Sequence, residues 1–151
     1  MNNTHYSLAF KPAELSRWAV KEAKRLANLF VNTKGLPVLV YTGLSGVSTA
    51  TALAIELDKY QVKYGMAYIR KGRESSHGCD MEHTYNLWNC HDYYMVFVDD
   101  FVDMGDTTRR CYKKLANTYG KPTGIVFSLC MATNRDDSAI KTLKKKYGEI
   151  K

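Results

Sequence analysis

The chain has 151 residues, of which 45% are hydrophobic and 25% charged. This balance is ordinary for one soluble globular domain and argues against a disordered or fibrous chain. No apolar run approaches the roughly 20 residues needed to cross a bilayer, and the first ten residues lack the basic and apolar regions of a signal peptide. We therefore expect a cytoplasmic protein with no membrane partner. The net charge of +7 favours polyanions, either nucleic acid or a multiply phosphorylated small molecule.

The four cysteines include no CxxC pair, which predicts reduced thiols rather than a disulfide framework. Five potential zinc ligands lie in one short segment: His77, Cys79, His83, Cys90 and His91. Their spacing matches no regular zinc pattern, so a zinc-stabilised interaction module is a minor alternative.

The first third of the chain predicts a helix, a strand, a turn and a second helix. Apolar residues recur at helical spacing from residue 14 to about 32, and Pro12 suits the entry to that helix. Residues 37–41 are a short apolar run typical of a buried strand, and a glycine turn follows at 42–46. Ser45 is expected to cap the next helix. The inward residues of that helix are expected to be Val47, Ala50, Ala54 and Leu57.

Strands and helices continue to alternate along the rest of the chain. The expected elements are a strand at 64–70, an irregular segment at 71–92, a strand at 93–98, a helix with Thr108, Cys111, Tyr112 and Leu115 on one face, a strand at 124–129 and a basic helix from about 136 to 147. This order predicts an α/β fold with a single-domain, parallel, twisted sheet flanked by helices. We expect residues 1–36 to hold the N-terminal helix, 37–130 the core and 131–151 the basic C-terminal helix.

Ligands of such sheets bind beyond the carboxyl ends of the strands, so the segments after residues 40, 69 and 98 are the ones that carry chemistry. The last of them, residues 96–108, puts Asp99 and Asp100 at a strand end and a glycine turn before a helix. Carboxylates hold sugar hydroxyls or hydrated Mg²⁺, and a helix N-terminus binds phosphate. This segment resembles the signature of the type I phosphoribosyltransferases.

The resemblance implies that Asp99 and Asp100 bind the ribose hydroxyls of phosphoribosyl pyrophosphate and Mg²⁺, directly or through water. It implies that residues 103–107 form the loop around the 5′-phosphate, with Gly105, Asp106, Thr107 and Thr108 as substrate-binding residues. Met104 replaces the usual Thr, and Asp106 replaces the usual Gly or Lys. An acid about 4 Å from a phosphate would be repelled by roughly 4 kcal/mol at an effective dielectric of 20. Asp106 must therefore point away from a bound phosphate, or else serve only as a helix cap.

The other two turns resemble the same family in the same order. The first resembles the pyrophosphate loop: Thr42, Gly43, Leu44, Ser45 and Gly46. Residues 68–78 resemble the flexible catalytic loop of the orotate branch, with Arg70, Lys71 and His77 as donors to the departing pyrophosphate. Asp103 stands where branches acting on 6-oxopurines place an acid that handles the proton of the base. These two clues indicate different bases, so the acceptor stays open between purine and pyrimidine.

The resemblance predicts a Mg²⁺-dependent phosphoribosyltransferase with a minimal hood, acting on phosphoribosyl pyrophosphate and a nucleobase, and expected as a homodimer. Hood candidates are Tyr6, Phe10, Tyr85, Trp88 and the residues after Leu129, although core packing is the expected role of each aromatic. The alternative is a non-catalytic regulator on the same fold that senses phosphoribosyl pyrophosphate and binds nucleic acid. The lysines of the last helix favour that alternative: Lys141, Lys144, Lys145 and Lys146.

Overall fold

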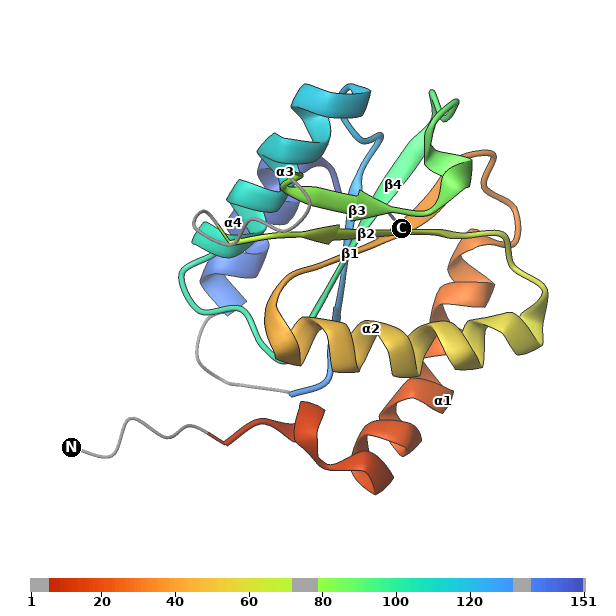
Figure 1. The fold of residues 1–151 in the computed structure, drawn as a ribbon, viewed down its shortest axis with the longest axis vertical. Coiled ribbons are helices and arrows are strands. Elements are labelled where there is room, and N and C mark those ends of the chain that lie inside the picture. Colours follow the sequence, from red (N-terminus) through yellow and green to blue (C-terminus); the bar gives the residue numbers. More distant parts are fainter. Residues whose placement is uncertain (1–5, 72–78, 132–136, 151) are drawn as a thin grey trace.

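In the computed structural model, residues 6–71, 79–131 and 137–150 are described, and they form one five-stranded sheet with helices on both faces (Figure 1). The strands are β1 Leu36–Tyr41, β2 Gly65–Ile69, β3 Met81–His83, β4 Tyr93–Asp99 and β5 Ile125–Leu129. The helices are α1 Pro12–Phe30, α2 Gly43–Leu57, α3 Asp106–Tyr119 and α4 Asp137–Tyr147. Three short 3₁₀ turns are η1 Leu8–Phe10, η2 Asp58–Tyr60 and η3 Tyr85–Leu87.

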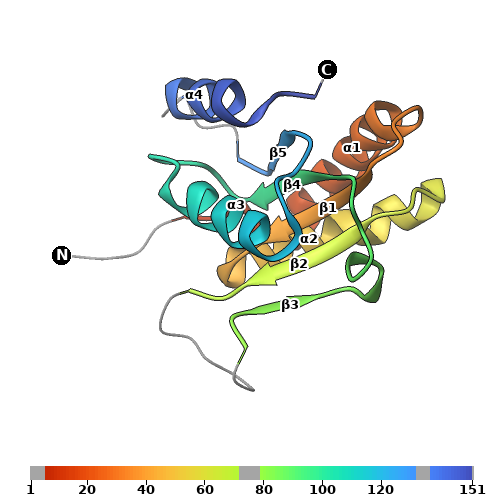
Figure 2. The same ribbon diagram turned by 90° about the horizontal axis from the view of Figure 1, so that it is seen from above.

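The strand order is β3-β2-β1-β4-β5, so β1 and β4 form the centre of the sheet (Figure 2). Helices α1 and α2 cover one face, and α3 and α4 cover the other. Alternate residues of β4 serve the two cores: Phe97 packs in the cluster that contains Leu115 of α3, and Val96 packs in the cluster that contains Leu53 of α2. Burial on both faces explains why residues 93–98 are apolar without alternation.

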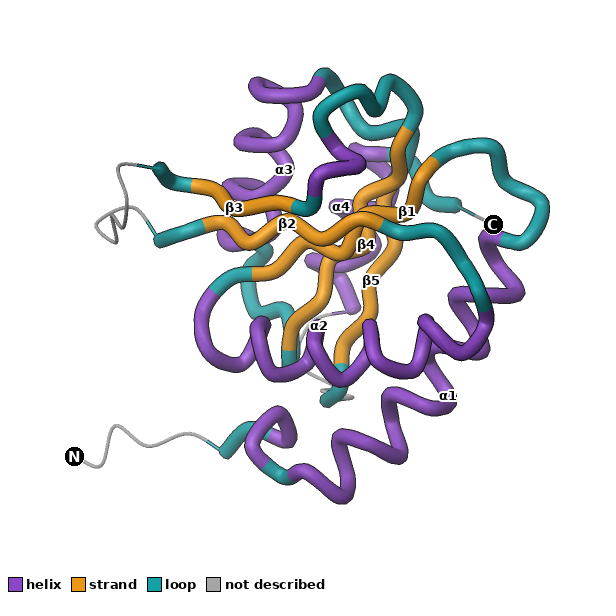
Figure 3. Tube along the Cα trace, turned by 45° about the vertical axis from the view of Figure 1, so that its right-hand side comes forward, coloured by secondary structure: helices purple, strands orange, loops and turns teal. Residues whose placement is uncertain are grey.

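The predicted parallel sheet is confirmed for β2, β1, β4 and β5, but β3 is antiparallel to β2. The expectation of an irregular segment at 71–92 was therefore wrong for β3 and η3. The strand β3 runs beside β2 at the edge of the sheet (Figure 3). Backbone hydrogen bonds flank the pairing, with the Arg70 nitrogen 2.9 Å from the Asp80 oxygen and the Thr84 nitrogen 2.9 Å from the Met66 oxygen. A strand of three residues is too short to display a hydrophobic period.

The predicted helices and other strands form within about two residues of their expected bounds. Pro12 is the first residue of α1, as expected. On α2 the buried stripe includes Ala50, Leu53, Ala54 and Leu57, whereas Val47 is 38% exposed, so its inward assignment was wrong. At about 100° per residue Val47 lies at the edge of the stripe, in line with Ala54, so its place on the helix is not the centre of the buried face. No helix in the described ranges is long and apolar enough to span a bilayer.

Candidate functional site at the carboxyl ends of β1, β2 and β4

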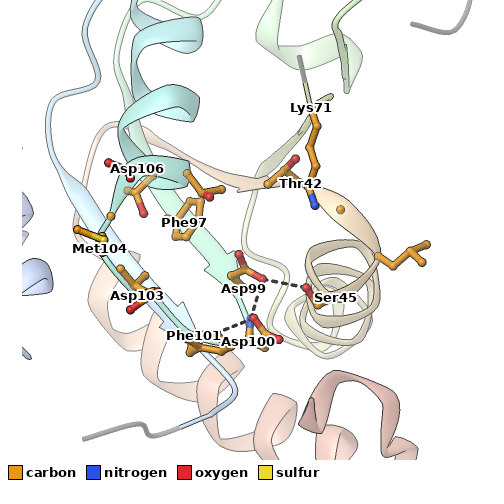
Figure 4. Close-up of a pocket in the computed structure, with 16 residues that line it drawn as sticks. Thr42, Ser45, Lys71, Phe97, Asp99, Asp100, Phe101, Asp103, Met104 and Asp106 are labelled. Atoms are coloured by element: carbon orange, nitrogen blue, oxygen red, sulfur yellow. Dashed lines mark hydrogen bonds between the residues drawn. The ribbon is translucent and has the colours of Figure 1, made fainter. Parts of the chain in front are cut away.

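The acid pair lies at the end of the central strand β4. Oδ1 of Asp99 accepts hydrogen bonds from Ser45 Oγ at 3.1 Å and from the backbone nitrogen of Asp100 at 2.8 Å (Figure 4). Asp100 is only 5% exposed, and its two oxygens accept from Ser7 Oγ and from the backbone nitrogen of Phe101, each at 2.9 Å. The two acids therefore differ: both oxygens of Asp100 accept from protein donors, whereas within the described residues Asp99 accepts only through Oδ1.

The pKa of Asp99 is raised from 3.8 to about 7, chiefly by burial and also by the neighbouring carboxylate of Asp100, while the hydrogen bonds from the Asp100 nitrogen and from Ser45 partly offset the rise. The charged form of Asp99 is thus unfavourable in the free protein. A cation or a set of hydroxyl donors beside Asp99 would relieve that cost. Perturbed carboxylates of this kind cluster at functional sites.

Asp99 and Asp100 line a cavity of about 370 Å³ that collects most of the predicted site. The predicted residues in its lining are Thr42, Gly43, Leu44, Ser45, Lys71, Asp99, Asp100, Asp103, Gly105, Asp106, Thr107 and Thr108. Four further residues line it: Phe97, Phe101, Val102 and Met104. Gly46 does not line the cavity, because it faces the sheet, where an added Cβ would lie 3.3 Å from Tyr41 Cβ.

The predicted phosphate loop turns into α3 at Gly105, which has a left-handed φ of +89° and forms the N-cap of that helix. Asp106 is the first residue of the helix and makes no capping bond, so the alternative that it serves as a helix cap was wrong. Its side chain is 85% exposed and pairs with Arg109 at 3.2 Å. Thr108, which also lines the cavity, is buried, and its Oγ1 has no hydrogen-bond partner among the described residues. The start of α3 therefore offers both an uncapped helix N-terminus and a free hydroxyl.

The predicted pyrophosphate turn begins α2 directly. Thr42 is the N-cap and makes no side-chain capping bond, and α2 starts at Gly43, which has a φ of +67°. Ser45 lies inside the helix and bonds Asp99, so its predicted cap role was wrong. The Lys71 ammonium lies over this turn, since a Cβ added to Gly43 would be 3.4 Å from Lys71 Nζ (Figure 4).

The predicted catalytic loop is only partly described. Arg70 does not line the cavity, and its guanidinium pairs with Glu82 of β3 at 2.6 Å. His77 and the rest of residues 72–78 lie outside the described residues. The catalytic roles expected of Arg70 and His77 stay predictions.

The aromatic hood candidates separate into two places. Tyr85 and Trp88 follow β3 at the amino end of β2, opposite the cavity, since Thr84 bonds Met66 near the start of that strand. Tyr6 and Phe10 flank the segment held to Asp100 by Ser7. All four rings are more than half exposed, so core packing was the wrong assignment for them. The N-terminal segment is the part of the candidate hood that reaches the site.

Sequence reasoning missed Ser7, which lies 93 residues from Asp100 in the chain and is 6% exposed. Ser7 Oγ also accepts a hydrogen bond from the Ala9 nitrogen and so caps η1. A single serine near the N-terminus carries no local pattern that would predict a contact over such a separation.

The zinc alternative gains no geometric support in the described ranges, where no three His, Cys, Asp or Glu side chains form a metal-binding group. His77 lies outside those ranges. Both ring nitrogens of His83 are engaged, by Trp88 Nε1 and by the Thr84 carbonyl. Cys90 donates to the Asp92 carbonyl at 3.3 Å.

The architecture is shared with known enzymes. An orotate phosphoribosyltransferase from Francisella tularensis aligns with a TM-score of 0.57 over 85% of this chain and 61% of its own, at 21% identity. A hypoxanthine phosphoribosyltransferase from Trypanosoma cruzi, in complex with the product IMP, aligns with a TM-score of 0.53 over 82% of this chain and 73% of its own, at 17% identity. The chain has the type I phosphoribosyltransferase fold.

The resemblance inferred from residues 96–108 is thus confirmed at the level of the type I phosphoribosyltransferase fold. The likeness extends to a single small domain, and this chain spans 61% of the length of the orotate enzyme. No protein-family model matches the sequence, and neither does any curated protein. The activity has to be argued from the site itself.

Proposed function

We propose that this chain is a phosphoribosyltransferase that moves the 5-phosphoribosyl group of phosphoribosyl pyrophosphate to a nitrogenous base, purine or pyrimidine, and releases pyrophosphate. The observation that carries the proposal is one cavity that brings together an acid pair, half-buried Asp99 and buried Asp100, and the N-termini of two helices, α2 and α3. Carboxylates accept hydrogen bonds from sugar hydroxyls, and helix N-termini bind phosphate. On this fold the combination supports a ligand that carries both a ribose and phosphate groups.

Each part of that ligand has a partner in the cavity. The ribose hydroxyls donate to Oδ2 of Asp99, because Oδ1 already accepts two hydrogen bonds. The 5′-phosphate binds the loop at 103–107 and the first turn of α3, where Thr108 Oγ1 is free to donate. Asp106 does not oppose it, since its carboxylate is exposed and paired with Arg109. The pyrophosphate binds the first turn of α2 beneath Lys71.

The donor set fits a Mg²⁺ ion that arrives with the diphosphate. Mg²⁺ in such sites is held by one or two carboxylates together with waters and substrate phosphates. Asp99 would supply one carboxylate oxygen to the ion. Asp100 would stabilise the strand end beside it, since both oxygens of Asp100 accept hydrogen bonds from protein donors. When bound, the ion would neutralise charge on the departing pyrophosphate.

The transfer breaks the bond between ribose carbon 1 and the pyrophosphate oxygen, and the electron pair leaves with the pyrophosphate. A nitrogen of the base forms the new bond to carbon 1 and loses its proton to the Asp103 carboxylate, which lines the cavity. Lys71 and the amides of α2 stabilise the negative charge of the leaving group. The apolar side chains of Phe97 and Phe101 in the lining limit access of water to the reacting carbon from their side of the cavity.

Calorimetric titration with phosphoribosyl pyrophosphate and Mg²⁺ tests the proposal first. We expect micromolar binding by the natural chain and by Asp92→Asn, an exposed acid just before β4 at its opposite end, and none by the Asp99→Asn, Asp100→Asn double variant. A panel of purine and pyrimidine bases, with pyrophosphate release as the signal, then identifies the acceptor. No binding at millimolar ligand, or equal binding by the double variant, would overturn the proposal.

A second candidate is a non-catalytic regulator that binds the same ligand and nucleic acid. The observation in its favour is the outer face of α4, where Lys141, Lys145 and Lys146 are exposed. Gel-shift titration over a range of salt concentrations tests it, because neutralised phosphates make binding steeply salt-dependent. Ligand binding without turnover of any base, together with specific retention of nucleic acid, would select the regulator.

A further inference from the structure

Arg110 of α3 connects the two segments that surround the proposed pyrophosphate position. One of its terminal nitrogens donates to the backbone oxygen of Arg70 at 2.8 Å, and the other donates to Thr42 Oγ1 at 3.4 Å. Thr42 follows β1 and Arg70 follows β2, and these strands are neighbours in the sheet. The guanidinium therefore lies across the carboxyl ends of two adjacent strands.

Arg110 has an unusual set of partners for a half-buried cation. Its neighbour Arg109 pairs with a carboxylate, as do Arg25 and Arg70. No carboxylate pairs with Arg110 in residues 6–71, 79–131 and 137–150, and both of its hydrogen-bond acceptors are neutral. A half-buried guanidinium beside neutral acceptors retains its positive field, which favours an anion nearby.

The bond from Arg110 also changes what Thr42 does. A threonine at an N-cap usually turns its hydroxyl oxygen toward the first amides of its helix. Thr42 makes no such bond, and its oxygen accepts from Arg110 instead. The first amides of α2 are thereby left without a side-chain cap, while Thr42 is 4% exposed and lines the cavity. The other hydrogen bond of Arg110, to the backbone oxygen of Arg70, fixes the backbone that immediately precedes Lys71.

We infer that Arg110 is a positioning residue for the diphosphate. Its hydrogen bond to Thr42 turns that hydroxyl away from the start of α2, and its hydrogen bond to the Arg70 oxygen holds the backbone just before Lys71. The uncapped amides of α2 and the Lys71 ammonium therefore converge on the same anion. The inference rests on the proposed function and names a residue outside the cavity lining as a determinant of diphosphate affinity. The 5′-phosphate position at α3 does not depend on Thr42 or Lys71. Arg110 should therefore affect one half of the ligand only.

The test compares Arg110→Gln, Arg110→Lys and the control Lys113→Gln, which removes the same charge from an exposed position of α3. Pyrophosphate with Mg²⁺ and ribose 5-phosphate are titrated separately by calorimetry, and thermal unfolding checks that each variant is folded. We expect Arg110→Gln to weaken pyrophosphate binding about tenfold, as for loss of hydrogen bonds from a charged group, and to leave ribose 5-phosphate binding unchanged. Arg110→Lys should recover part of the loss, and Lys113→Gln should match the natural chain. Equal weakening of both ligands, or of neither, would overturn the inference.

A second measurement tests whether Arg110 acts through Thr42. Thr42→Val and Arg110→Gln should be non-additive for pyrophosphate binding, whereas Thr42→Ser, which retains the hydroxyl, should keep natural affinity. Full additivity would contradict the coupling. If the natural chain binds neither pyrophosphate nor phosphoribosyl pyrophosphate, the proposed function fails. If it binds both and Arg110→Gln binds them equally well, only this inference fails.

Discussion

Replacing Asp99 with Asn should stabilise the protein at alkaline pH while removing its ligand. The raised pKa means that the folded chain holds a proton at Asp99 that the unfolded chain releases between pH 3.8 and about 7. Stability from this group is therefore fully present at low pH and is lost as the pH rises through that window. A difference of about 3 pKa units corresponds to a ceiling of about 4 kcal/mol, and screening by cavity water reduces our expectation to about 2 kcal/mol. Asn keeps an oxygen that can accept from Ser45.

The assay is urea unfolding of the natural chain and Asp99→Asn at pH 5 and pH 8. At pH 5 the folded chain still holds the proton while the unfolded chain has released it, so about a third of the window from pH 3.8 to about 7 has been crossed and the variant should be more stable by only about 0.7 kcal/mol. At pH 8 the variant should be more stable by about 2 kcal/mol, since it carries no buried charge. Asp103→Asn is the matched control, because Asp103 is an exposed acid of the same cavity, and its effect should stay within about 0.5 kcal/mol. A variant that is less stable than the natural chain at pH 8 would refute the reasoning.

Three further changes test other parts of the site. Ser7→Ala should lower the free energy of unfolding by about 1 to 3 kcal/mol, measured in urea, because it removes a donor from buried Asp100; an unchanged midpoint would exclude that bond. Asp106→Asn should alter stability by less than about 0.5 kcal/mol and affinity for phosphoribosyl pyrophosphate by less than about twofold, since the carboxylate is exposed and paired with Arg109; marked tightening in calorimetry would show that it faces the phosphate. Gly105→Ala should cost about 1 to 3 kcal/mol, because φ is +89° and the new Cβ would lie 2.9 Å from a leucine carbon of α4; thermal unfolding at the natural temperature would contradict this.

The fold was predictable because its main elements carry strong local patterns. The apolar run at 93–98 and the helical spacing on α1 each need burial on a defined face, and the alternation of strands and helices leaves few topologies. The antiparallel β3 could not be predicted, because its pairing with β2 depends on backbone bonds and on Glu82 meeting Arg70 across the strands. Val47 was misplaced because α2 contains too few polar residues before Glu56 to mark its exposed side.

The site was predictable where its residues follow strands directly. Asp99 and Thr42 each follow the last residues of a parallel strand, and such ends meet at one edge of a sheet. Spacing could not show that Arg70 would turn to Glu82, since a guanidinium reaches either side of its strand. Nor could it show the contacts of Ser7 or Arg110, which join segments far apart in the chain.

Several incompletely satisfied groups surround this one cavity, and that concentration is the strongest physical argument for a ligand. Buried polar atoms are normally paired, and an unpaired one costs about 1 to 3 kcal/mol. Among the described residues only three buried side-chain atoms lack a partner, and one of them, Thr108 Oγ1, belongs to the cavity wall. The charged form of Asp99 is disfavoured, and the guanidinium of Arg110 pairs with no carboxylate of the described ranges. A phosphorylated sugar with its metal ion would satisfy the first two directly, because its phosphate accepts from Thr108 and its hydroxyls and cation relieve Asp99, while its diphosphate would lie against the amides and the ammonium that Arg110 positions.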